Sequence, residues 1–450
     1  MEAAAAPQAP GENAAPPPAP RWSGGSAAAW CVAAYFWFWT TTPYVRFSIF
    51  ATIRFERLVV AGTLAAAAAS GRLKVRFPVI TCFFLLLFAF EYLSYAVSSY
   101  AGSTEAQWWA NEYWKFIVFH LVIVWSITTT RDLRFVLIGA AFVALFYQFH
   151  SFTDYVRGGS YVYQQGMKRF AGTWGLGGGG AGNSMGVLGM TTLPLAVYAF
   201  QNSHRRFWRR VFGGGIVLCP VSIFLSGTRG AMVCAIFYAF TKVNKRNRMR
   251  MLGALLGALA LAPLVMPETH WKRYTGFITG TYSDNERVSA MAEHSGESRI
   301  DGLIGGLTLG LSNPILGLGP GSSPRARAAL RGYAAPEEIM NDENSFIALH
   351  NMYGQMAAEI GSVGSGIFLL MLWTAWSRTR RAARRLERQN DPTATALAEM
   401  GRALNSVLVL YFAYGMFGHE LYSYRWCFFL GLQAVFLEEV KRFNARRETA

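Results

Sequence analysis

Twelve apolar runs constrain the fold of this 450-residue chain more than any other feature. Most are close to the 20 or so residues that a transmembrane helix needs. The chain is 52% hydrophobic and only 15% charged, whereas an ordinary soluble domain is about 25% charged. We therefore expect an all-α polytopic membrane protein with about twelve transmembrane helices. The predicted spans are 26–45, 48–69, 77–100, 113–130, 133–151, 183–201, 211–226, 230–242, 251–267, 348–376, 402–418 and 424–440.

Clusters of basic residues separate these runs and alternate in density from loop to loop. Basic loops of membrane proteins lie in the cytoplasm, so we expect both termini there and the longest loop on the opposite side. The net charge of +16 would suit a nucleic-acid binder, but here it is distributed as topology signals. We expect a lipid bilayer and no nucleic acid as a partner. The clusters lie within 72–76, 131–134, 205–210, 242–250, 378–402 and 441–447.

The spans divide the chain into five segments. The first 25 residues are mostly Ala, Pro and Gly, lack the order of a signal peptide, and predict a disordered tail. A loop of roughly 80 residues before the tenth span is long enough to suggest a function of its own. Helical spacing of its apolar residues predicts an amphipathic helix over Ser298–Leu311 at the outer membrane surface. The segments are a cytoplasmic tail (1–25), nine spans (26–267), the extracytoplasmic loop (268–347), three spans (348–440) and a second cytoplasmic tail (441–450).

Two arginines stand at the outer boundary of the predicted membrane. Arg229 follows a Ser-Gly-Thr turn, whose backbone N–H groups beside a guanidinium would suit a phosphate. The alternative is that Arg229 extends to the lipid headgroups. Arg299 begins the amphipathic helix and would form a surface ion pair with Glu297 or Asp301 if it had no other role. Together the two arginines would form a clamp for a diphosphate.

His350 and Glu359 lie where the long loop re-enters the membrane. An imidazole takes up a proton near neutral pH, so His350 is a candidate base, although a solvated histidine at a membrane boundary is an equally simple interpretation. Glu359 is about 14 Å along the tenth span at 1.5 Å per residue. A carboxylate at that depth needs a partner or a proton.

Two glycine-rich segments belong to the extracytoplasmic loops. The first runs from Arg169 through Gly177–Gly180 to Asn183, and glycine allows the backbone to approach a ligand closely. A flexible connector is the alternative. The second, Pro314–Gly321, predicts tight turns after the amphipathic helix, or a plain chain reversal.

The chain has no recognisable metal or nucleotide motif. It lacks HExxH, a paired-carboxylate glycosidase signature and a phosphate loop ending in Gly-Lys-Ser/Thr. Its five cysteines lie inside apolar runs and not in CxxC pairs, which argues against a zinc site or a disulfide framework. We therefore expect no metal and no cofactor.

The order of these motifs resembles the O-antigen ligase and polymerase superfamily of bacterial envelope proteins. One feature differs, because that family commonly has Pro-Asn where this chain has Gly182 before Asn183. The resemblance covers about residues 165–370. The matching pieces are Gly172-Thr173-Trp174 with Asn183, the Ser-Gly-Thr-Arg turn at Arg229, Arg299, the segment Asn313–Gly319, the pair His350-Asn351, and Glu359-Ile360-Gly361 with Gly364.

The resemblance implies a metal-independent glycosyltransferase of the bacterial inner membrane with its active site facing the periplasm. Such enzymes move a glycan from undecaprenyl diphosphate to an acceptor. By position, Arg229 and Arg299 would hold the diphosphate, Arg169 would add positive charge, and His350 would help to deprotonate the acceptor hydroxyl, giving an inverting displacement. Supporting roles would fall to Asn183, Asn351 and Glu359.

Our first hypothesis is an O-antigen ligase that joins glycan to lipid A–core. The alternatives within the superfamily are an O-antigen polymerase and a protein O-glycosyltransferase. A lipid or polysaccharide transporter is the alternative that is not an enzyme. Transporters usually place charges at the membrane midplane, whereas the candidate charges here cluster at the outer boundary.

Overall fold

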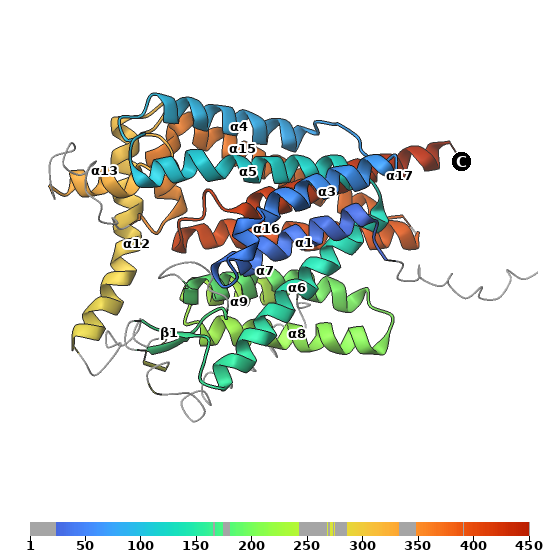
Figure 1. The fold of residues 1–450 in the computed structure, drawn as a ribbon, viewed down its shortest axis with the longest axis horizontal. Coiled ribbons are helices and arrows are strands. Elements are labelled where there is room, and N and C mark those ends of the chain that lie inside the picture. Colours follow the sequence, from blue (N-terminus) through green and yellow to red (C-terminus); the bar gives the residue numbers. More distant parts are fainter. Residues whose placement is uncertain are drawn as a thin grey trace, which may run out of the picture.

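In the computed structural model, the described residues are 24–164, 167–173, 181–242, 268, 271, 272, 274, 286–332, 348–389 and 391–449. Helices dominate this part of the chain, and most lie side by side as a bundle (Figure 1). The helices are α1 (Ala27–Thr41), α2 (Ile49–Thr52), α3 (Phe55–Ala69), α4 (Val79–Ala96), α5 (Thr104–Ser126), α6 (Thr130–Val156), α7 (Ala181–Gln201), α8 (Arg206–Leu225), α9 (Arg229–Lys242), α12 (Glu286–Ser312), α13 (Ser323–Leu330), α15 (Met352–Glu387), α16 (Pro392–Tyr414) and α17 (Tyr424–Glu448). Short 3-10 turns are η1 (Pro43–Val45) and η3 (Gly415–Phe417), and strands β1 (Tyr161–Gln164) and β2 (Met167–Phe170) form an antiparallel pair.

The helical nature of the apolar runs is confirmed wherever the chain is described. Within that part, four helices are long and apolar enough to cross a membrane, namely α4, α6, α8 and α15. The number twelve stays a prediction, because the ninth run (251–267) lies outside the described residues. The helices α1, α3 and α9 are also shorter than the roughly 20 residues of a typical span.

The bundle has two chemically different ends. The basic end carries the loops around Arg72, Arg131, Arg205 and Arg388, and both the start of α1 and the end of α17 lie there (Figure 1). The site end carries the β1–β2 hairpin, the turn between α8 and α9, and the start of α15. Helix α12 crosses the site end instead of running along the bundle (Figure 1).

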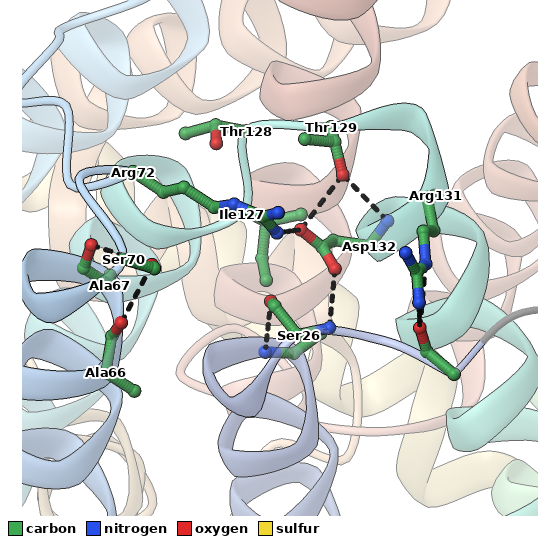
Figure 2. Close-up of polar contacts among 12 residues, drawn as sticks. Ser26, Ala66, Ala67, Ser70, Arg72, Ile127, Thr128, Thr129, Arg131 and Asp132 are labelled. Carbon is green, nitrogen blue, oxygen red and sulfur yellow. Dashed lines mark hydrogen bonds and ion pairs between the residues drawn. The ribbon is translucent and has the colours of Figure 1, made fainter.

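A buried carboxylate fastens the basic end, as Figure 2 shows. Asp132 is fully buried near the start of α6, and its Oδ1 accepts a hydrogen bond from the backbone N–H of Ser26 at 2.8 Å. Its Oδ2 accepts from the hydroxyl of Thr129 at 2.9 Å and from the guanidinium of Arg72 at 3.2 Å. One side chain therefore joins the start of α1, the start of α6 and the loop after α3.

Two features of the site end were not expected from the sequence. The loop after α6, expected to be a glycine-rich connector, contains the β1–β2 hairpin, in which Val162 pairs with Arg169. The second predicted span starts late, because Arg54 has a left-handed backbone (φ 51°) and α3 begins only at Phe55. Strands of four residues are too short for alternation of polar and apolar residues to show in the sequence.

Glycines bring α12 into backbone contact with the first half of α15. Gly302, Gly306 and Gly310 recur every four residues and therefore share one face of α12. A Cβ on Gly310 would lie 2.6 Å from the carbonyl oxygen of Ala357, which no side chain tolerates. The opposite face carries apolar side chains that are exposed: Ile300, Ile304, Leu307 and Leu311. The predicted segment 298–311 is thus helical, with its glycine face inward and its apolar stripe outward.

Helix α15 is interrupted at Gly361, where the backbone adopts φ 59° and ψ −165°. The segment 313–319 fills the break. Leu318 and Gly319 donate backbone hydrogen bonds to the carbonyls of Ala358 and Glu359 at 2.8 and 3.0 Å. Pro314–Gly321 is therefore more than a chain reversal, since it replaces helical hydrogen bonds that the break removes.

Candidate active site

Arg169 connects the hairpin to two helix termini. Its side chain is only 2% exposed. The Nε donates to the carbonyl of Ser226 at 2.7 Å, Nη1 donates to Gln164 Oε1 at 2.5 Å, and Nη2 donates to Asn183 Oδ1 at 2.6 Å. All three acceptors are neutral oxygens, so the guanidinium charge is not cancelled locally. Burial, with smaller contributions from Arg299 and Arg229, lowers the pKa of Arg169 to about 10, which still leaves it charged at neutral pH.

This network joins Arg169 and Asn183 to the turn between α8 and α9. The three bonds use three of the five N–H groups of the guanidinium, and contact of Arg169 with a diphosphate, as the resemblance implies, stays a prediction. The local sequence explains the close packing. A Cβ on Gly182 would lie 2.9 Å from Arg169 Nε, and a Cβ on Gly186 would lie 2.5 Å from Thr228 Cβ. Glycine before Asn183 therefore leaves space for the guanidinium. Trp174 and Gly177–Gly180, which belong to the same motif, lie outside the described residues.

The turn between α8 and α9 places Arg229 at the first residue of α9. Gly227 has a left-handed backbone (φ 64°), and the Ser226 hydroxyl accepts from the backbone N–H of Thr228 at 3.3 Å. The N–H of Gly227 donates to the Phe224 carbonyl at 2.9 Å. These two N–H groups are therefore occupied, contrary to our expectation of a turn that donates N–H groups to an anion. Binding of an anion at this position would depend on the Arg229 guanidinium and the positive end of the α9 dipole.

Arg299 lies one turn before the glycine face of α12, and α15 fixes its backbone. Asn351 caps α15 by accepting from the N–H groups of Tyr353 and Gly354 at 3.0 and 3.1 Å. The Nδ2 of Asn351 donates to the carbonyls of Arg299 and Met416 at 3.4 Å each. Asn351 thus holds α12, α15 and η3 together beside His350.

The three arginines influence one another through their charges. Burial lowers the pKa of Arg299, and the charge of Arg229 lowers it further. The Arg299 guanidinium lies 5.8 Å from the ring centroid of Phe417. Gly230, next to Arg229, packs against the same ring, because any Cβ there would overlap Phe417. Asp301, one expected ion-pair partner of Arg299, pairs with Arg331 at 3.0 Å instead. The side chain of Glu297 lies outside the described residues.

His350 stands at the junction of α12, α13 and α15. Its backbone is left-handed (φ 51°), an uncommon conformation for a side chain with a Cβ. Its ring lies 5.2 Å from that of His419, centroid to centroid. Burial lowers the pKa of His350 to about 4, with further contributions from His419, Arg299 and Arg327. The imidazole is therefore neutral at neutral pH and able to accept a proton.

Glu359 has the partners that its depth demands. It is fully buried, and its Oε1 accepts from the Ser323 hydroxyl at 2.5 Å and the Ser323 N–H at 3.3 Å. Its Oε2 accepts from the Gly321 N–H at 3.0 Å and from Gln355 at 3.3 Å. The carboxylate thus caps the start of α13 and locks the segment 317–323 onto α15.

Sequence reasoning missed two charged or titratable neighbours of His350. Arg327 in α13 is 5% exposed and donates to the Ala348 carbonyl at 3.2 Å. His419 lies between η3 and α17, and its ring neighbours that of His350. The sequence could have indicated that Arg327 is partly buried. It lies among small residues in 323–330, and the aliphatic stem of an arginine can pack into the protein. Nothing local indicated that His419 lies next to His350.

Comparison with known proteins supports the resemblance on which these roles depend. Residues 214–369, about a third of the chain, match the family described as O-antigen ligase. The matched region includes Arg229, Arg299, His350, Asn351 and Glu359. No curated protein matches the chain. The chain thus carries an O-antigen ligase domain over residues 214–369, which confirms its resemblance to the O-antigen ligase and polymerase superfamily.

Proposed function

We propose that this protein is an O-antigen ligase that transfers glycan from undecaprenyl diphosphate to lipid A–core on the periplasmic face of the bacterial inner membrane. The observation that carries the proposal is the convergence of three basic side chains at the site end. Arg229 is close enough to Arg299 for its charge to lower the pKa of Arg299. Arg299 is in turn close enough to His350 to lower the pKa of the imidazole. The O-antigen ligase domain supports this assignment.

The geometry suits a displacement at the anomeric carbon of the donor sugar. The acceptor hydroxyl oxygen forms the new glycosidic bond, and the bond between the anomeric carbon and the diphosphate oxygen breaks. The hydroxyl proton moves to His350, and the diphosphate leaves with its lipid. Arginine suits the leaving-group side, because it stays charged and binds phosphate oxygens bidentately. A base on the opposite side inverts the anomeric configuration.

In this scheme, binding of the donor raises the pKa of His350. Burial, and to a smaller extent the positive charges near His350, hold its pKa at about 4 in the free protein. A diphosphate bound to Arg299 brings negative charge that offsets them and raises the proton affinity of the imidazole. His350 therefore becomes a stronger base when the leaving group is in place.

The polarity of the bundle supports the proposed orientation. The arginine and histidine cluster lies at the site end, and the loops rich in basic residues lie at the basic end together with the described chain ends. By the positive-inside rule, the basic end faces the cytoplasm and the site end faces the periplasm. This orientation fits a reaction on flipped, lipid-linked glycan.

A gel of lipopolysaccharide tests the function. Expression in a ligase deletion strain should restore the ladder of long glycan on the core, and Arg229→Ala, Arg299→Ala or His350→Ala should abolish it while the protein stays folded in the membrane. Unchanged ladders in all three variants would contradict the proposal. In a polymerase deletion strain, which attaches a single repeat to the core, restored chain length would assign the protein as a polymerase instead.

A further inference from the structure

A cavity lies next to His350 and has no role in the scheme above. Its volume is about 750 Å³, and it opens among α1, α5, the start of α15 and the segment 419–425. Ala348, Gln355 and His419 form the part of its wall that adjoins His350. In the described part of the chain, Arg169, Arg229 and Arg299 do not line it.

Aromatic rings form much of the wall. The face of a sugar ring carries C–H groups, which stack on aromatic side chains, and Trp and Tyr add a polar atom to that surface. Small-molecule pockets generally combine such apolar area with a few polar groups that fix the orientation of the ligand. The aromatic members of the lining are Trp39, Trp108, Trp109, Phe116, Tyr422 and Tyr424.

Several buried polar atoms in the wall lack a partner within the described residues, among them one on Trp109 and one on Gln355. Trp109 is 1% exposed and its Nε1 donor is unsatisfied, and Gln355 is 7% exposed and its Oε1 acceptor is unsatisfied. A buried unsatisfied polar group costs roughly 1–3 kcal/mol, so such groups generally serve a purpose. One donor and one acceptor in an aromatic wall match a hydroxylated ligand.

Charge in the wall disfavours a lipid chain as the occupant. The carboxylate of Glu420 lies 3.7 Å from the guanidinium of Arg425, and Glu105 pairs with Arg325 at 2.8 Å. Glu105, Glu420 and Arg425 all line the cavity. An isoprenoid or acyl chain would desolvate these groups without replacing their hydrogen bonds.

The position of the cavity identifies which sugar it would hold. His350 adjoins both the arginines and the cavity, since Asn351 beside it donates to the Arg299 carbonyl, and the ring of His350 lies 5.2 Å from that of His419, which lines the cavity. A base that receives the acceptor proton must lie on the acceptor side, away from the leaving diphosphate.

We infer that the aromatic cavity binds a sugar of the acceptor glycan and presents its hydroxyl to His350. The inference rests on the proposed function, because it takes the arginine side to hold the donor. Trp109 donates to one sugar hydroxyl and Gln355 accepts from another, while the surrounding rings stack on the sugar face.

Conservative variants test the inference without relying on loss of fold. Trp109→Phe keeps a ring but removes the Nε1 donor. Gln355→Met keeps the length of the side chain but removes the Oε1 acceptor, together with the Nε2 bond to Glu359. Each should raise the Kd for deacylated core oligosaccharide and the KM for the acceptor, roughly three- to ten-fold, as expected for one lost hydrogen bond. Binding of undecaprenyl diphosphate should not change.

Trp125→Phe is the matched control. The Trp125 Nε1 donates to the Arg76 carbonyl at 3.1 Å at the basic end, so this variant loses the same volume and also an existing hydrogen bond. It should lower the unfolding temperature more than Trp109→Phe does, and it should leave acceptor affinity unchanged. A purely structural role for Trp109 predicts the reverse order.

The outcomes separate this inference from the proposed function. Unchanged saccharide affinity in both cavity variants would overturn the inference, and so would an equal loss of affinity for undecaprenyl diphosphate, because the cavity would then hold the donor. If the wild-type protein binds the free O-antigen repeat but not core oligosaccharide, and Trp109→Phe weakens that binding, the cavity assignment stands and the ligase assignment fails.

Discussion

The contact between α12 and α15 offers the most quantitative test of how the fold positions the site. Gly302 lies three residues after Arg299 and packs directly on the backbone of Leu349, next to His350. In Gly302→Ala, the new Cβ would lie 2.8 Å from the carbonyl carbon of Leu349 and closer still to its oxygen. Neither atom belongs to a flexible side chain, so the two segments must move apart.

The size of the expected effect follows from these distances. Ordinary van der Waals contact begins at 3.4 Å, so the two backbones must separate by more than about 1 Å to relieve the overlap with the carbonyl oxygen. A displacement of about 1 Å in a catalytic arrangement can cost roughly 100-fold in rate. We expect Gly302→Ala to lower glycan transfer by about that factor, and the overpacking to cost about 1–3 kcal/mol of stability.

The assay compares transfer by purified Gly302→Ala and Gly305→Ala protein, normalised to folded protein. A Cβ on Gly305 meets nothing within 4 Å, so this control changes the same helix on its open face. It should keep full activity and gain about 0.5–1 kcal/mol in stability from the better helix former. Full activity of folded Gly302→Ala would refute the claim that this contact sets the position of Arg299.

Three further predictions concern the buried charges. Burial, with smaller contributions from positive neighbours, lowers the pKa of His350 to about 4, so the neutral base is lost only as pH falls through that value. Arg327→Gln removes one such charge and should move the acid limb of the kcat/KM profile to higher pH by up to about one unit; an unmoved or lower limb would contradict this. Glu359→Ala leaves the N–H groups at the start of α13 without their acceptor and should cost roughly 2–4 kcal/mol in thermal unfolding, more than Glu359→Gln, which retains one acceptor oxygen. Asp132→Ala at the basic end should lower the unfolding free energy by roughly 2–3 kcal/mol but leave transfer per folded molecule unchanged (Figure 2), and a selective loss of turnover would show that the two ends are coupled.

The sequence was a good guide to the helices because their cause is local. The backbone N–H and C=O groups of each apolar run must hydrogen-bond to one another, and a helix satisfies them within one segment. Caps such as Asn351 and Asp391 mark where helices begin. The break at Gly361 could not be predicted, because hydropathy continues through it. The break exists only because segment 313–319, more than 40 residues earlier in the chain, supplies the missing hydrogen bonds.

The sequence indicated candidate site residues but not the contacts that hold them in place. The sequence indicated that Glu359 needs a partner, yet its partners at Gly321 and Ser323 come from a different segment. Arg169 stays a candidate ligand of the diphosphate, but its bonds to Asn183 and Ser226, which tie the hairpin to α7 and α8, could not be predicted from the sequence. Such assignments depend on which segments meet in space, and that information is absent from residue spacing.

Direct binding of undecaprenyl diphosphate tests the central claim, that Arg229 and Arg299 hold the leaving group and His350 does not. In nanodiscs, Arg229→Gln and Arg299→Gln should each weaken binding at least roughly ten-fold, because each loses a charged contact to phosphate. His350→Ala should bind the lipid as well as the wild type, although it does not transfer glycan. Wild-type affinity in both arginine variants, or loss of binding in the His350 variant alone, would contradict the account.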